Sequence, residues 1–262
     1  FDYRLDETSL GRLVGKYWAA LDAVEKLHEA ICDLKGDVPF DLELSIDEHP
    51  NEVPTFDCLT SEAELTFVLL EARRRGIPLT HVAPNFGVEK GTDYRGADGL
   101  SGFEARAASL WRIAEEFGVM VDFHSGDDLS GATRRAIGRA TQGRNHFKVS
   151  PNLQLLFAEV LAEYHPGLFR RWWEDALAYA RREAAAGSAF ALDCIPQSAA
   201  GTPSAHDAVF HHFSFAFVGR RDANGQFICR EEFYDLSPAF YQAYRRCIAA
   251  YLLELAEDLF GP

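Results

Sequence analysis

Apolar residues follow two different spacings along this chain. Some stretches repeat them every three or four positions, which predicts amphipathic helices, and shorter stretches alternate them with polar residues or run them together, which predicts strands. The predicted helices cover residues 8–33, 61–75, 102–117, 130–141, 152–163, 166–186 and 237–259. The predicted strands cover residues 40–47, 78–86, 119–123, 146–149, 190–194 and 209–219. Because strands alternate with helices, we expect an α/β fold with a parallel sheet.

The length of the chain suits one barrel of parallel strands and outer helices. The chain has 262 residues, without internal repeats or linker-like stretches. We therefore expect a TIM-type (β/α) barrel that forms a single domain over residues 1–262. Six predicted strands are fewer than the eight of a complete barrel, and the only methionine is Met120. We accordingly expect the barrel to lack N-terminal elements of a longer chain.

The charge of the chain excludes some classes of partner. A net charge of −14 argues against nucleic acids and anionic membranes, which need a basic surface, but allows a small anionic substrate in a pocket. The sequence has no apolar run long enough to span a bilayer. Its five cysteines are scattered without C-x-x-C spacing, which is typical of reduced thiols and predicts a cytoplasmic protein. The oligomeric state stays open and includes a homo-oligomer.

Polar residues follow several predicted strands at the point where each ends. Asp47, Glu48 and His49 follow the first, His124 follows the run Val119–Phe123, and His146 lies in the next strand. Carboxyl ends of parallel strands carry the active site of a barrel. Glu48, His124 and His146 are therefore candidate ligands for Mn, Fe, Co, Ni or Zn. An acidic loop and hydrogen-bonded structural histidines are the alternative interpretation.

Other side chains near these strand ends could act on a substrate. Asp47 is a candidate base beside the predicted ligand. Glu89 lies in a glycine-flanked loop after the second strand and could be an acid, a base or an exposed carboxylate. Lys90 and Lys148 could bind a substrate carboxylate or be surface lysines. Three further residues form a second tier, as alternative ligands or substrate contacts: His49, Asp127 and His212.

At these residues the sequence resembles the tagaturonate epimerase family, whose members interconvert tagaturonate and fructuronate. The resembling segments are Ser45-Ile46-Asp47-Glu48, Ala83-Pro84-Asn85-Phe86, Glu89-Lys90-Gly91-Thr92-Asp93-Tyr94, His124-Ser125-Gly126-Asp127-Asp128 and His146-Phe147-Lys148. The resemblance implies a metal-dependent barrel. It suggests Asp47 as proton acceptor, Glu89 as proton donor, and a metal held by Glu48, His124 and His146. After Lys148 the sequence departs from the small-residue turn that the family leads us to expect.

The chemistry of such a substrate favours one route. In a 2-keto hexuronate the C4–H bond is not acidic, because C4 is β to the carbonyl. Inversion at C4 is therefore expected to proceed by retro-aldol cleavage of the C3–C4 bond and reclosure on the other face of the aldehyde. A metal would stabilise the enediolate as a Lewis acid. A metal-dependent aldolase or isomerase on a related sugar needs similar groups, and a non-catalytic sugar-binding relative is a further alternative.

Overall fold

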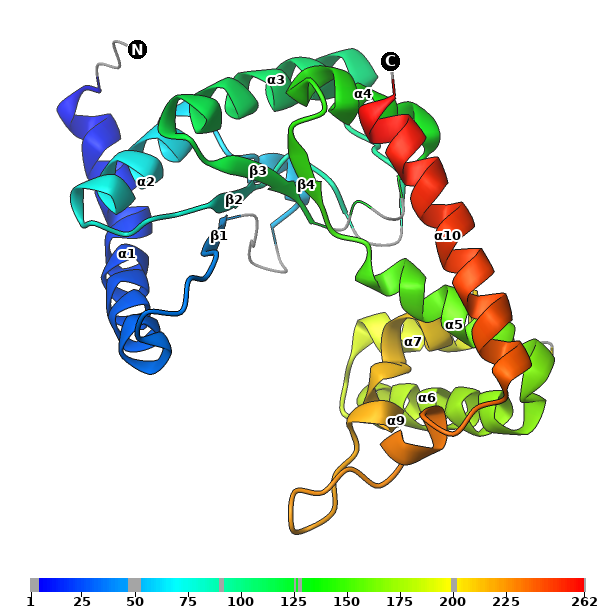
Figure 1. Ribbon diagram of the computed structural model, residues 1–262. Helices are drawn as coiled ribbons and strands as arrows, with labels where there is room; N and C mark the ends of the chain where they lie inside the picture. The colour runs from blue at the N-terminus through cyan, green and yellow to red at the C-terminus, as the bar shows by residue number, and fades with distance from the viewer. Residues whose placement is uncertain are drawn as a thin grey trace. The chain divides into compact units, whose positions relative to one another are not determined.

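The computed structural model describes residues 5–46, 53–89, 92–124, 126, 129–198 and 202–261 (Figure 1). Its strands are β1 (Glu43–Ile46), β2 (His81–Pro84), β3 (Met120–Phe123) and β4 (Asn145–Phe147). Its α-helices are α1 (Glu7–Lys35), α2 (Glu62–Arg74), α3 (Gly99–Phe117), α4 (Gly131–Thr141), α5 (Ser150–Tyr164), α6 (Pro166–Ala185), α7 (Ala189–Ser198), α8 (Ala208–Phe213), α9 (Phe215–Gly219) and α10 (Pro238–Phe260). The described residues also form the short 3-10 helices η1 (Thr55–Asp57) and η3 (Arg230–Phe233).

The chain divides into two compact units. The first comprises Phe1–Val149 and Leu255–Pro262, and the second comprises Ser150–Glu254. The first unit contains the whole described sheet, whereas the second consists of helices and their connections. Two packing units can belong to one evolutionary domain, so the single domain over residues 1–262 stays a prediction.

The sheet of the first unit is parallel throughout. Its four strands lie in the order β1-β2-β3-β4, which is also their order in the chain. Right-handed crossovers that always step in the same direction place every connecting helix on the same face of the sheet. The parallel α/β class is therefore confirmed. Four strands are described where the sequence predicted six, and the closed barrel stays a prediction.

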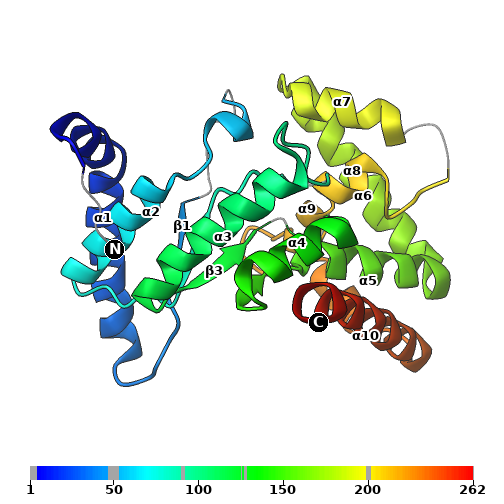
Figure 2. The ribbon, with the colours of Figure 1, turned by 90° about the horizontal axis from the view of Figure 1, so that it is seen from above.

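Helices α2, α3 and α4 cover one face of this sheet (Figures 1 and 2). Register aligns Leu44 with Val82 and Val82 with Val121, so these apolar side chains share a face. Val82 and Val121 pack with helix residues such as Phe103 and Ile137, both fully buried. The four helix spans from α1 to α4 that the sequence predicted are confirmed to within a few residues, because each presents an apolar stripe at helical spacing.

A carboxylate joins α1 to the beginning of α2. Ser61 and Glu64 form a capping box, in which the Ser61 hydroxyl accepts from the Glu64 backbone N–H and the Ser61 backbone N–H donates to the Glu64 carboxylate. The same carboxylate accepts from Lys16 Nζ at 2.5 Å and from the Tyr17 hydroxyl at 3.1 Å, both on α1. Burial raises the pKa of Tyr17 to about 12, so its hydroxyl stays protonated as a donor.

The two strands predicted in the second half of the chain are wrong. Residues 190–194 lie in α7, and residues 209–219 form α8 and α9. In the second segment the buried residues Val209, Phe210, Phe213 and Phe217 are spaced as on a helix. His211 and His212 consequently lie on the short helix α8.

Packing against α6 explains why this aromatic run is helical. Phe210 contacts the rings of Phe169 and Trp172, at centroid distances of 5.4 and 4.8 Å. Trp172 Nε1 also donates to the backbone carbonyl of Ser214, at 2.7 Å, where α8 meets α9. Aromatic residues favour strands intrinsically, but that preference is weak and tertiary burial overrides it.

Among the described residues, none of the helices has the length and apolar character needed to cross a bilayer.

The Glu64 contacts predict a pH-dependent contribution to stability. Burial raises the pKa of Glu64, but hydrogen bonds from Lys16 and Ser61 outweigh it and leave the pKa below its ordinary value of 4.5. A carboxyl group with a lowered folded pKa stabilises the fold above the unfolded pKa and loses that effect as the pH falls through the folded pKa. We expect Glu64→Gln to cost about 1 kcal/mol at pH 7 and progressively less below pH 4.5.

Urea unfolding of both proteins between pH 7 and pH 3 measures this difference. The control is Glu29→Gln, at an exposed position of α1, which should change the free energy of unfolding by less than about 0.5 kcal/mol at every pH. A Glu64→Gln deficit of the same size at both ends of the pH range would contradict the interpretation.

Candidate functional site

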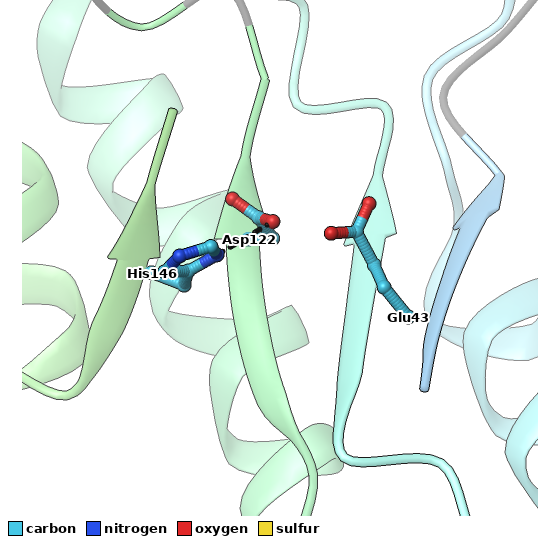
Figure 3. Close-up of side chains that lie close together, drawn as sticks. All are labelled: Glu43, Asp122 and His146. Atoms are coloured by element: carbon cyan, nitrogen blue, oxygen red, sulfur yellow. Dashed lines mark hydrogen bonds and ion pairs between the residues drawn. The ribbon is translucent and has the colours of Figure 1, made fainter. Parts of the chain in front are cut away.

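Polar side chains gather on the face of the sheet opposite to α2, α3 and α4. Register aligns Glu43 with His81 and Asp122 with His146, and alternation along β3 places His124 on the same face as Asp122. Figure 3 shows Glu43, Asp122 and His146 directed toward one another from three strands. One ligand atom from each of these three residues lies within 4.8 Å of the other two.

Asp122 is the centre of this group. Its side chain is 1% exposed, and its Oδ2 lies 2.8 Å from His146 Nδ1 and 3.7 Å from His124 Nε2. Its other oxygen, Oδ1, is buried without a hydrogen-bond partner among the described residues. One carboxylate thus brings together the two histidines that the sequence predicted as ligands.

Glu43 reaches the same place from β1. Its Oε1 lies 2.7 Å from His124 Nε2, although β2 lies between β1 and β3 in the sheet. Ala83 of β2 pairs with Ser45 of β1 and therefore lies on the same face as Glu43. Its small side chain leaves room for the Glu43 carboxylate to cross β2. The imidazole of His124 therefore lies between two carboxylates, one on each side of β2.

His81 adds a third imidazole beside this group. Its ring centroid lies 5.1 Å from that of His146, and its Nδ1 contacts the Thr80 hydroxyl at 2.9 Å. The donors on this face are thus imidazole nitrogens and carboxylate oxygens, the set that divalent transition metals prefer. A buried carboxylate oxygen without a partner is costly, and a cation would satisfy it. The residues therefore fit a divalent metal.

Glu89 lies beyond the end of β2, in a loop held by hydrogen bonds. The buried Asn85 donates to the carbonyl of Cys58 at 3.1 Å and accepts from the Gly87 N–H at 2.9 Å, which shapes this loop. The carboxylate of Glu89 accepts two hydrogen bonds from Arg95, at 2.6 and 2.9 Å, and a third from the Thr55 hydroxyl. These contacts hold Glu89 in one orientation.

Asp93, from the same resembling segment, has a structural role. Its Oδ1 accepts from the backbone N–H of Ser130 at 3.0 Å and from the Thr133 hydroxyl at 2.8 Å, at the beginning of α4. Burial raises the pKa of Asp93, but these hydrogen bonds outweigh it and leave the pKa below its ordinary value. An ionised carboxylate is stabilising at a helix N-terminus, so Asp93 anchors its loop to α4.

Of the other predicted site residues, the structure describes Lys148 and His212. Lys148 follows β4 directly, and its backbone N–H donates to the carbonyl of Phe123, so alternation puts its side chain on the face of His146. His212 belongs to the second unit and packs edge-on against Phe190, at a centroid distance of 4.9 Å. Five predicted residues lie outside the described residues: Asp47, Glu48, His49, Lys90 and Asp127.

The sequence interpretation missed three members of the group: Glu43, His81 and Asp122. A period-two pattern could have found Asp122, because it lies two positions before His124, just as His146 lies two positions before Lys148. The candidates taken from the sequence were mostly residues that follow the strands, whereas Glu43, His81 and Asp122 lie within the strands. An acidic residue inside an apolar strand is itself a signal, since such a carboxylate is buried only with partners.

Comparison with known proteins identifies the family. Residues 1–255 match the tagaturonate epimerase family. The chain belongs to this family. The resemblance noted from the sequence motifs is thereby confirmed, and the match extends well beyond the motifs. A comparison with curated proteins finds no significant match.

Solved structures of one such epimerase are similar to the chain. Fructuronate-tagaturonate epimerase UxaE from Cohnella laeviribosi, solved with two glycerol molecules, has a TM-score of 0.73 and 25% identity, over 98% of this chain and 53% of that one. Its complex with one glycerol has a TM-score of 0.73 and 26% identity, over 98% and 52%. The native form has a TM-score of 0.72 and 25% identity, over 98% and 53%. The chain thus spans about half the length of these solved relatives.

The geometry around Asp122 predicts stabilisation by metal that depends on both histidines. A ligand that binds only the folded state raises its stability, by about 2.7 kcal/mol at a hundredfold excess over Kd. We expect Zn²⁺ or Mn²⁺ to raise the midpoint of thermal unfolding, and His124→Ala and His146→Ala each to abolish most of that rise. Differential scanning fluorimetry with and without metal measures it.

The matched control is His28→Ala, which removes a histidine of α1 that packs against Phe40. This variant should keep the full metal-dependent rise whatever its own midpoint is. A rise that survives in His124→Ala and His146→Ala would exclude these residues as metal ligands.

Proposed function

We propose that this protein is a metal-dependent epimerase that interconverts tagaturonate and fructuronate by inversion at C4. The observation that carries the proposal is the contact of His124 and His146 with one buried carboxylate, in a chain that belongs to the tagaturonate epimerase family. The glycerol bound in the solved relative is a small polyol, which supports a sugar-like ligand. The test is product NMR after incubation of the protein with tagaturonate, where appearance of fructuronate is the expected outcome.

We propose that the four strands are part of a (β/α) barrel. Their sequential parallel order and the helices on one face support this, because a doubly wound sheet would reverse direction and carry helices on both faces. In such a barrel the opposite face, with Asp122 and His146, would line the interior. The scattered cysteines support a cytoplasmic location.

The proposed ligands are Glu48, His124 and His146, with His49 as an alternative to Glu48. A divalent cation held there would supply Lewis-acid stabilisation of negative charge on the substrate oxygens. The metal would be Mn, Fe, Co, Ni or Zn, since imidazole and carboxylate donors suit all of them. Lys148 would pair with the substrate carboxylate from the same face of the sheet, and Lys90 is a second candidate for this role.

Two carboxyl groups would move the protons. Asp47 takes the proton from the C4 hydroxyl, the C3–C4 bond breaks, and its electron pair passes through C3 to the C2 carbonyl oxygen, which leaves an enediolate and an aldehyde. The aldehyde turns over, C3 attacks its other face, and Glu89 protonates the new C4 oxygen. In the reverse direction the two groups exchange roles, as microscopic reversibility requires. The hydrogen bonds from Arg95 and Thr55 would hold Glu89 in position.

An aldolase on a related sugar is the second candidate function. It would use the same ligands and the same bond cleavage but release the two fragments. Free three-carbon products in the NMR spectrum would favour it over the epimerase, and metal binding without any turnover would favour a sugar-binding relative.

Substitution of the proposed base separates metal binding from chemistry. We expect Asp47→Asn to retain metal and lose turnover by about 10²–10⁴-fold, because the amide cannot accept the hydroxyl proton. Metal content and epimerisation rate are measured on the same sample. Asp41→Asn, at an exposed position before β1, is the control and should keep both. Near-normal turnover of Asp47→Asn would transfer the role to Glu89 or His49.

Isotopic labelling tests the route. Retro-aldol cleavage leaves the hydrogen on C4 in place, because only the hydroxyl proton and the C3–C4 bond take part. Substrate with deuterium at C4 should therefore give product that is still labelled at C4 in ordinary water, as measured by NMR and mass spectrometry. Loss of the label to solvent would indicate proton abstraction at C4 and would overturn the retro-aldol route, while leaving the epimerase assignment intact.

A further inference from the structure

We infer that Asp122 is a positioning residue of the metal centre, which holds the imidazole of His146 by Nδ1 and so presents Nε2 of that ring to the cation. The inference rests on the proposed function in one respect, the choice of His146 as a ligand. Asp122 itself has no role in the sequence-based site.

The contact between Asp122 and His146 selects one tautomer of the imidazole. Asp122 Oδ2 lies 2.8 Å from His146 Nδ1, which is a hydrogen-bond distance. An ionised carboxylate only accepts, so Nδ1 carries the proton, and in a neutral imidazole the lone pair is then on Nε2. Histidine ligands of metals are commonly oriented by a carboxylate on the other ring nitrogen.

The carboxylate of Asp122 is held in place by its strand and by burial. Asp122 lies in β3, which pairs with β2 on one side and with β4 on the other. Its register partner on β4 is His146 itself. Its side chain is 1% exposed, whereas that of His146 is 54% exposed. The buried partner therefore fixes the exposed one, and the ring extends from the sheet with Nε2 away from its anchor.

The same oxygen of Asp122 lies near both predicted histidine ligands. Oδ2 also lies 3.7 Å from His124 Nε2, and Glu43 contacts that nitrogen from the other side. Removal of the carboxylate would thus loosen two imidazoles at once. An ordinary structural aspartate would affect folding but would leave the tautomer of His146 and the strength of metal binding unchanged.

Nitrogen-15 NMR of the metal-free protein at pH 8 tests the tautomer, with the His146 signals assigned by their loss in His146→Gln. We expect a protonated Nδ1 and an unprotonated Nε2. On addition of Zn²⁺ the Nε2 resonance should shift on coordination while Nδ1 keeps its proton. Protonation at Nε2, or coordination of zinc through Nδ1, would overturn the inference. This measurement needs no variant of Asp122 to fold.

Zinc affinity, measured by calorimetry, tests the consequence. Asp122→Asn should weaken Zn²⁺ binding by about 10–100-fold, the usual effect of losing such a partner. The control is Met120→Leu, on the same strand and the same face two positions earlier, which should stay within about twofold. Circular dichroism establishes that both variants are folded. A folded Asp122→Asn with wild-type affinity would overturn the inference, as would zinc coordination by Asp122 Oδ1 itself.

These measurements use zinc alone and no sugar acid. A protein that fails to epimerise tagaturonate but shows the expected tautomer and affinities would refute the proposed function and support the role of Asp122. A protein that epimerises tagaturonate with the opposite tautomer would do the reverse.

Discussion

Parallel pairing of four short strands, with their connecting helices on one face, is the constraint from which the rest of the first unit follows. Because side chains alternate along a strand, one face must be apolar to pack beneath α2, α3 and α4, and the other is released from that requirement. The face opposite to the helices carries Glu43, His81, Asp122 and His146. Ionisable groups can gather there without disturbing the core, since Phe103 and its neighbours are on the opposite side.

The polar face shows how burial and function depend on each other. Asp122 is almost fully enclosed, and a carboxylate in that position is stable only if donors or a cation surround it. Its two neighbouring imidazoles provide part of that compensation. Metal centres with histidine ligands rely on such outer contacts as much as on the ligands, because the contacts decide where the ligand nitrogens point. The fold thus holds this carboxylate on a strand that is paired on both sides.

The loops that follow the strands are held by different means. Asn85 and Asp93 bind backbone and hydroxyl groups, and these hydrogen bonds place the loop that carries Glu89 together with the packing of Val88 and Tyr94 against the core. This division agrees with the general behaviour of α/β folds, where strands give stability and the loops at their carboxyl ends carry chemistry. The family match covers both, over residues 1–255, although the chain spans about half the length of the solved relatives.

Local sequence pattern determined much of the first unit, and in the second it located α5, α6 and most of α10 but not α7, α8 and α9. The capping box at Ser61 and the apolar stripes of α1 to α4 act within a few residues, so pattern alone located them. The aromatic run of α8 and α9 misled the same reasoning, because contacts of Phe210 with Trp172 on α6 outweigh a weak strand preference. The motifs with His124 and His146 were visible in the sequence. Their common partner Asp122 was not visible, because Asp122 meets His146 only through strand pairing. Glu43 likewise meets His124 only across β2. Contacts between residues distant in the chain depend on register, and only the tertiary structure sets that register.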